Sequence, residues 1–74
     1  MAFYGYEIKV LNATRVRVLY DGELICKFDR TEEDLQEMVT SILDWALEDG
    51  SIKSHARKAV KPAILAEVME KFSI

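Results

Sequence analysis

Apolar and polar residues alternate with a period of two over much of the first thirty positions. Tyr4, Tyr6 and Ile8 alternate with small or polar residues, and the same pattern returns in 15–19 and 24–28. Such alternation, in segments rich in β-branched and aromatic residues, predicts half-buried strands. We therefore expect an antiparallel sheet of three strands over this part of the chain. Its inward face is predicted to consist of Tyr6, Ile8, Val10, Val16, Val18, Leu24, Cys26 and Phe28.

The connection at Asp21-Gly22 decides the register of the second hairpin. A two-residue Asp-Gly turn would set Leu24 opposite Leu19 and would mix the two faces of the sheet. A three-residue loop with Gly22 in the left-handed conformation instead sets Leu24 opposite Val18 and keeps the apolar residues on one face. The same requirement, that the apolar residues share one face, predicts a loop with an odd number of residues between the first two strands.

Residues 31–49 have the pattern of an amphipathic helix. Thr31 is a suitable N-cap, acidic residues fill the first turn, and Gly50 follows the last turn. At about 100° per residue, the apolar positions cover roughly 200° of the helical wheel. That arc is wider than one contact with a sheet requires. We expect the helix to pack on the sheet with one part and on another helix, or on a second subunit, with the remainder.

The last part of the chain contains Pro62. The apolar residues before Pro62 cluster on one side of the helical wheel, and those after it would point roughly 150° away in a continuous helix. Proline also disfavours a helical Lys61 and suits a first helical turn. The pattern therefore predicts two helices, at 51–60 and 62–73.

These elements together predict one α+β domain that spans 1–74. It consists of a three-stranded antiparallel β-meander (1–30) followed by two or three α-helices packed on one face, in the order βββαα or βββααα. No repeat, linker or low-complexity segment indicates a second domain.

Composition narrows the class of protein. The chain has 74 residues, 50% of them hydrophobic, and a single cysteine, so that a disulfide framework is excluded. We expect a small cytoplasmic domain that self-associates as a homodimer, because one core of this size seldom supplies more than a few kcal/mol. No apolar run approaches the roughly 20 residues of a membrane span, and the start lacks the features of a signal peptide.

Charge is distributed unevenly along the chain. The net charge of −3 divides into +1 over residues 1–30, −7 over 31–50 and +3 over 51–74. This division predicts pairing between an acidic ridge on one helix and a basic stripe on the next, within one subunit or across a dimer. The residues expected to pair are Glu33, Glu37, Asp44, Glu48, Lys53, Arg57 and Lys61.

The sequence offers no catalytic set. Cys26 is expected to pack in the core as a small apolar residue, and His55 lies among basic residues that disfavour a catalytic pair. The acidic helix lacks the loop spacing of a calcium site, and the three glycines are isolated. We therefore expect no enzymatic activity, no cofactor, no metal and no small-molecule substrate.

The outward face of the predicted sheet is the strongest candidate for binding. Its side chains combine basic and apolar character, which suits a protein partner or the phosphate backbone of a nucleic acid. The residues expected to bind a partner are Lys9, Arg15, Arg17, Leu19, Ile25 and Lys27.

One resemblance concerns the segment Arg15-Val-Arg-Val-Leu-Tyr-Asp-Gly, followed by Phe28 and by Thr31-Glu-Glu at the start of a helix. It resembles the layout of the three-stranded arm-type DNA-binding domains of tyrosine recombinases, whose sheet enters the major groove. The resemblance implies that DNA would be read by Lys9, Arg15, Arg17 and Lys27.

The acidic helix and the net negative charge favour a protein over a nucleic acid as the partner. We therefore expect a non-enzymatic interaction module that binds a protein, with nucleic-acid binding by the basic sheet face as the alternative. Compact acidic domains without a catalytic set are common among accessory or inhibitory proteins of phages and other mobile elements, and we expect such a role here.

Overall fold

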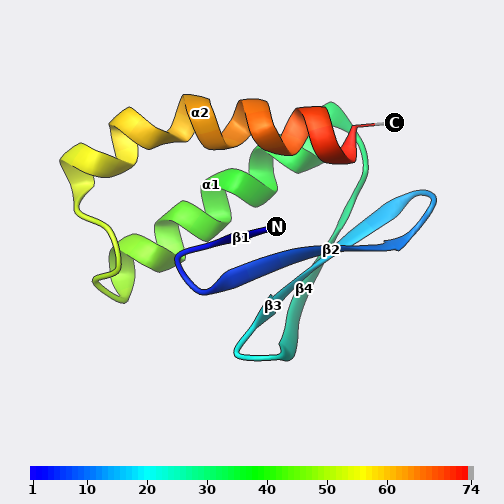
Figure 1. The fold of residues 1–74 in the computed structure, drawn as a ribbon, viewed down its shortest axis with the longest axis horizontal. Helices are drawn as coiled ribbons and strands as arrows, with labels where there is room; N and C mark the ends of the chain where they lie inside the picture. Colours follow the sequence, from blue (N-terminus) through cyan, green and yellow to red (C-terminus); the bar gives the residue numbers. More distant parts are fainter. Residues whose placement is uncertain (74) are drawn as a thin grey trace.

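Four antiparallel strands followed by two helices make up residues 1–73, the part of the chain that the computed structural model describes (Figure 1). Neighbouring strands along the chain are neighbours in the sheet, in the order β1-β2-β3-β4. The elements are β1 (Ala2–Phe3), β2 (Tyr6–Asn12), β3 (Arg15–Tyr20), β4 (Glu23–Asp29), α1 (Glu32–Glu48) and α2 (Ser54–Phe72). The predicted α+β order, an antiparallel sheet and then helices, is confirmed. Ile74, the last residue of the predicted domain, lies outside the described residues.

The sheet has one strand more than the sequence pattern predicts. Tyr4 and Gly5 both have positive φ, at 55° and 89°, and they form a two-residue turn that folds β1 back onto β2. Phe3 therefore pairs with Tyr6, and Ala2 pairs with Glu7. The alternating pattern places Tyr4 in the first strand, and this is wrong because Tyr4 lies in the turn.

The turn between β3 and β4 has two residues, so the predicted three-residue loop is wrong. Asp21 and Gly22 have φ values of 53° and 82°, and the flanking Tyr20 and Glu23 are paired. Two successive positive φ values are typical of the turn that Asp-Gly favours, because its twist matches the twist of the strands. The local preference of the dipeptide therefore determines the loop length.

A β-bulge in β4 then keeps the apolar side chains of the strand on the inward face, which a two-residue loop alone would not do. Leu19 pairs with Leu24, but the next pair is Val18 with Cys26, so Ile25 is an extra residue without a partner in β3. The two-residue turn therefore leaves Leu24 on the outward face beside Leu19, and the bulge returns Cys26 to the inward face. Ile25, predicted to face outward, lies on the helix side, where it lines a hollow with aromatic residues.

The β2–β3 hairpin also combines a two-residue connection with a bulge. Asn12 pairs with Arg15 across a two-residue connection, whereas Val10 pairs with Val16. Leu11 is therefore an extra residue in β2, and the predicted odd-length loop is wrong. The Asn12 side chain supports the turn by accepting a hydrogen bond from the backbone N–H two residues later, at 2.9 Å.

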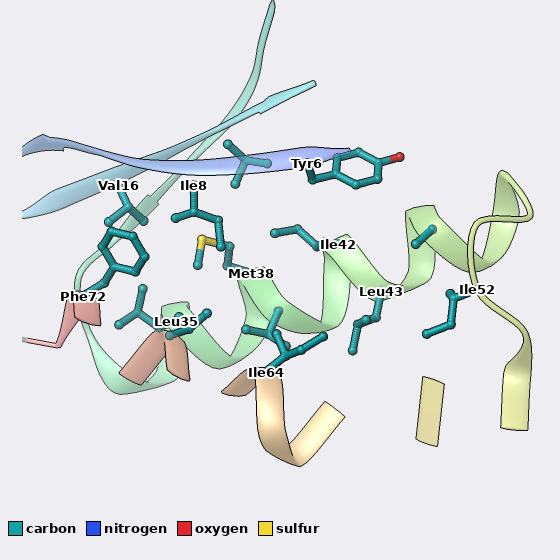
Figure 2. Packing of buried hydrophobic residues seen from close by; sticks show 14 residues of the cluster. Tyr6, Ile8, Val16, Leu35, Met38, Ile42, Leu43, Ile52, Ile64 and Phe72 are labelled. Carbon is teal, nitrogen blue, oxygen red and sulfur yellow. The ribbon is translucent and has the colours of Figure 1, made fainter. Parts of the chain in front are cut away.

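The core lies on both sides of α1, which runs between the sheet and α2 (Figure 1). Figure 2 shows Met38 and Ile42 on the side of α1 that faces Ile8 of the sheet, and Leu43 on the side toward Ile64 of α2. The prediction that the wide apolar arc divides between the sheet and another helix is confirmed. The buried hydrophobic residues are Tyr6, Ile8, Val16, Val18, Leu35, Met38, Val39, Ile42, Leu43, Ala46, Ile52, Ile64, Val68 and Phe72.

Two residues predicted to face inward are exposed instead. Leu24 is 50% exposed because the two-residue turn sets it opposite the outward Leu19, and Val10 is 48% exposed. The tip of the β2–β3 hairpin extends past the N-terminal end of α1 (Figure 1), and Val10 is therefore left uncovered. Cys26 and Phe28 are half-buried, and the other four predicted inward residues are buried.

The N-terminus of α1 is capped as the sequence predicts. The Thr31 hydroxyl accepts a hydrogen bond from the Asp34 backbone N–H at 3.1 Å, and three acidic residues occupy the first turn. Gly50 follows the helix with φ of 85°. These contacts are local, so they form wherever this segment is helical.

Helix α2 runs through Pro62 without a break, so the prediction of separate helices at 51–60 and 62–73 is wrong. The buried residues Ile64 and Val68 follow the half-buried Val60 at intervals of four. Each such step turns the contact stripe by about 40° around the helix axis. Because α2 crosses α1 obliquely, successive turns present different faces to it (Figure 1). One helix can therefore bury apolar residues on both sides of Pro62.

A hydrogen bond joins β2 to the C-terminal end of α1. The Tyr6 hydroxyl donates to Oδ2 of Asp49 at 3.1 Å, and Oδ1 of Asp49 accepts from the Ser51 backbone N–H at 2.9 Å. The hydrogen bonds from Ser51, and then that from Tyr6, lower the pKa of the Asp49 carboxyl. Burial, followed by the bond to Asp49, raises the pKa of Tyr6.

Replacing the proline tests the continuity of α2. Pro62→Ala restores an N–H that can bond to the Lys58 carbonyl, so we expect the free energy of unfolding to rise by about 1 to 2 kcal/mol in urea titrations. Pro62→Gly restores the same N–H but is a poor helix former, and we expect it to gain about 1 kcal/mol less. No gain from Pro62→Ala would indicate that the helix ends before residue 62.

The Asp49 contacts predict a dependence of stability on pH. A carboxyl whose pKa is lower in the folded state contributes stability above its ordinary pKa, about 3.9, and loses it as the pH falls through the lowered value. We expect the difference in free energy of unfolding between the wild type and Asp49→Asn to shrink over this acid range. Urea titrations at a series of pH values measure it, with Glu37→Gln as the control for loss of one charge. A difference that stays constant would contradict the assignment.

Candidate functional site

One face of the sheet is not covered by any element within residues 1–73, because both helices lie on the other face (Figure 1). We call this surface the open face. Its outward side chains include Glu7, Lys9, Arg15, Arg17, Leu19, Leu24, Lys27 and Asp29. Of the residues predicted to bind a partner, Lys9, Arg15, Arg17, Leu19 and Lys27 lie here, and Ile25 does not.

Three cations form a row across the middle of the open face. Lys9 on β2 pairs directly with Arg17 on β3, and Arg17 pairs directly with Lys27 on β4. Like charges directly opposite one another in a sheet destabilise it. The sheet therefore tolerates a repulsion here that contributes nothing to the core. We call these three residues the cationic row.

The cationic row is only weakly compensated. Lys9 lies 3.5 Å from a carboxylate oxygen of Glu7, and both side chains are about half exposed. Within residues 1–73, neither Arg17 nor Lys27 has a carboxylate oxygen within 4.0 Å. Nε of Arg17 is covered by its neighbours and has no hydrogen-bond acceptor in that same part of the chain. The centre of the row is thus positive and open to an acidic group.

Arg15 differs from the other basic residues of the open face. It is the cross-strand partner of Asp29, and its Nε lies 3.2 Å from a carboxylate oxygen of that residue. Both side chains are exposed, so that the pair adds little to stability. It does, however, give Arg15 a carboxylate partner, which leaves Arg17 and Lys27 as the basic residues of the open face without one among residues 1–73.

An apolar pair lies beside the cationic row. Leu19 and Leu24 are cross-strand partners, and Leu19 is also the partner of Glu7. Leu19 is half-buried and Leu24 is 50% exposed. The open face therefore combines positive charge with exposed apolar surface. The sequence pattern missed Leu24 because the two-residue turn sets it opposite Leu19, whereas a three-residue loop was predicted.

The predicted pairing between the two helices is present at one position. Arg57 on α2 donates from Nη2 to Oδ1 of Asp44 on α1 at 2.5 Å, with the Arg57 side chain largely covered. The other residues of the predicted set form no ion pair within 4.0 Å inside the described range: Glu33, Glu37, Glu48, Lys53 and Lys61. Most of the acidic ridge therefore faces solvent.

The residues considered for chemistry lie apart. Cys26 is half-buried in β4, and His55 is exposed at the start of α2. Among residues 1–73, no three His, Cys, Asp or Glu side chains gather where they could hold a metal ion. None of the helices in that range has the length and apolar character needed to cross a membrane.

Comparisons with family models, with curated proteins and with solved structures found no match to this chain. Function is therefore inferred from the surfaces of the molecule.

A change of charge at the end of the cationic row tests the repulsion. Lys27→Glu places a carboxylate opposite Arg17, whereas Lys27→Gln only removes the charge. We expect Lys27→Glu to unfold with a free energy about 0.2 to 1 kcal/mol higher than that of Lys27→Gln in dilute buffer. The difference should shrink at about 1 M salt, where the screening length is only about 3 Å. Equal stability of the two variants in dilute buffer would contradict the description of the row.

Proposed function

We propose that this protein is a non-enzymatic interaction module that binds an acidic, partly apolar surface of a protein partner through its open face. The observation that carries the proposal is the juxtaposition of the cationic row with the exposed Leu24 and its half-buried partner Leu19. Neither feature serves the core, which lies on the other side of the sheet.

The charges explain why binding would be favourable. Arg17 and Lys27 repel each other in the free protein and have no carboxylate partner within residues 1–73. Acidic side chains of a partner would remove that repulsion and would form charge-assisted hydrogen bonds with Arg17. Complementary charges at the edge of an interface mainly set specificity and the rate of association.

The apolar pair supplies the other part of an interface. Leu24 is 50% exposed, and its burial under a partner would contribute through the hydrophobic effect. Protein interfaces combine such an apolar centre with a polar rim. Phosphate backbones offer no comparable apolar surface. This difference favours a protein over a nucleic acid as the main partner.

Nucleic-acid binding is the second candidate, because the cationic row extends across three adjacent strands. Lys9, Arg17 and Lys27 would contact phosphates along such a row, with Arg15 released from Asp29. The chain's net charge of −3 and the exposed acidic ridge of α1 work against the approach of a polyanion. We therefore rank this function second.

Self-association and cellular setting belong to the same proposal. Because α2 covers much of the apolar arc of α1, a homodimer would use what remains at its margins, where Leu47 is 38% exposed. We propose that the protein works in the cytoplasm as an accessory or inhibitory protein of a mobile element. Light scattering of the purified protein measures the oligomeric state directly.

Affinity capture from the native host tests the main proposal. We expect Leu24→Asp and Lys27→Glu each to abolish capture of a stoichiometric partner, whereas Lys58→Glu on the far helix retains it. Thermal unfolding of each variant shows whether the fold is kept. Undiminished capture by both open-face variants would exclude this face as the binding surface.

A binding assay with duplex DNA separates the second candidate from the first. If nucleic acid is the partner, binding is present at low salt, falls steeply as salt increases, and is lost in Lys27→Glu. That outcome would replace the main proposal. Absence of binding even at low salt would end the nucleic-acid alternative.

A further inference from the structure

A cleft lies on the helix side of the sheet, between the β3–β4 hairpin and the last turns of α1. Two adjoining hollows, of about 280 and 340 Å³, form it and share Tyr6 and Trp45. The cleft is lined by Tyr6, Tyr20, Ile25, Trp45, Glu48 and Asp49. It is separate from the open face, which lies on the other side of the sheet.

Three aromatic rings from different elements meet in this cleft. The ring centres of Tyr6 and Tyr20 are 4.7 Å apart, and those of Tyr6 and Trp45 are 5.6 Å apart. The planes are tilted by 40° and 37°, in the range of favourable aromatic pairs. Tyr6 is buried, but Tyr20 is 44% exposed and Trp45 is half-buried. Two rings therefore remain accessible to a ligand.

The β3–β4 hairpin supplies the remaining wall. Its two-residue turn sets Leu24 opposite Leu19, so that the next residue, Ile25, faces the helix side of the sheet. There Ile25 lines the cleft with Tyr20 and Trp45, although 45% of it stays exposed. Ile25 is also the extra residue of the bulge, and bulges are over-represented beside functional sites.

The charged residues that line the cleft are both acidic. Asp49 is held in place by hydrogen bonds from Tyr6 and Ser51. Glu48 has no ion pair or side-chain hydrogen bond to any residue within 1–73. The combination of accessible aromatic rings with an unpaired carboxylate is complementary to an organic cation.

We propose that this cleft binds the arginine side chain of a partner polypeptide, with its guanidinium group against the rings of Tyr20 and Trp45 and paired with Glu48. A guanidinium is planar, stacks on aromatic faces and matches a carboxylate with two parallel hydrogen bonds. An apolar side chain would cover Glu48 without a partner, which is unfavourable. A lysine ammonium is more strongly hydrated and cannot stack. The proposal does not depend on the open face.

Trp45 is the only tryptophan in the chain, so its fluorescence reports directly on the cleft. The probes are blocked Gly-Arg-Gly, Gly-Lys-Gly and Gly-Leu-Gly peptides, titrated at constant ionic strength. We expect a saturable change in Trp45 emission with the arginine peptide, a weaker affinity for the lysine peptide, and no saturable change with the leucine peptide.

Two matched variants assign the affinity to the carboxylate. Glu48→Gln and Glu37→Gln each remove one exposed acidic charge from α1, but only Glu48 lines the cleft. We expect Glu48→Gln to weaken binding of the arginine peptide about fivefold and Glu37→Gln to leave it unchanged. Tyr20→Leu should weaken it as well, with thermal unfolding as the check on the fold.

Three results would overturn the proposal. They are no saturable response to the arginine peptide, equal affinity for the leucine or lysine peptide, and wild-type affinity in Glu48→Gln. None of these measurements involves the partner of the open face, so that failure here leaves the proposed function standing.

Discussion

Burial of α1 on two opposite sides is the constraint on which the rest of the structure depends. Six of the fourteen buried hydrophobic residues described here belong to this one helix, and it contacts both the sheet and α2. A chain of 74 residues can bury only a limited amount of apolar surface. A helix that packs between two layers increases this amount, because it buries apolar residues on both of its sides. The arrangement also leaves the second face of the sheet uncovered. Residues on that face, such as Arg17 and Leu24, are therefore free to serve binding.

The β2–β3 and β3–β4 hairpins each contain a bulge, and these bulges decide which side chains lie on each face of the sheet. In the β3–β4 hairpin, the two-residue turn places Leu24 on the open face and Ile25 in the aromatic cleft, and the bulge at Ile25 then returns Lys27 to the open face. The bulge at Leu11 keeps Val10 paired with Val16 while the hairpin ends in a two-residue connection. A single extra residue in a strand thus determines which surface receives an apolar side chain. In this protein the bulge in β4 shapes both candidate binding surfaces.

The sequence was sufficient for those features that depend on local chemistry. The Thr31 cap, the acidic first turn and the arc of α1 follow from residue types and helical spacing, and the cationic residues of the open face follow from alternation. Features that required a choice between two local solutions were predicted wrongly. In the β3–β4 hairpin, either a longer loop or a bulge can keep the apolar residues on one face. The preference of Asp-Gly for a two-residue turn selected the bulge. On a helical wheel, the apolar residues around Pro62 look the same whether they belong to two separate helices or to one helix whose apolar stripe winds around its axis. The cleft could not be predicted, because its residues meet only through the two-residue turn before β4 and the crossing of α1 over the sheet.

Binding of a partner at the open face can be measured by NMR. Methyl resonances of the protein are recorded free and in complex with the partner captured from its host. If the partner binds the open face, we expect large shifts for Leu19 and Leu24 on that face and small shifts for Leu47 and Ile64 on the helices. Large shifts confined to Leu47 and Ile64, with Leu19 and Leu24 unchanged, would contradict it.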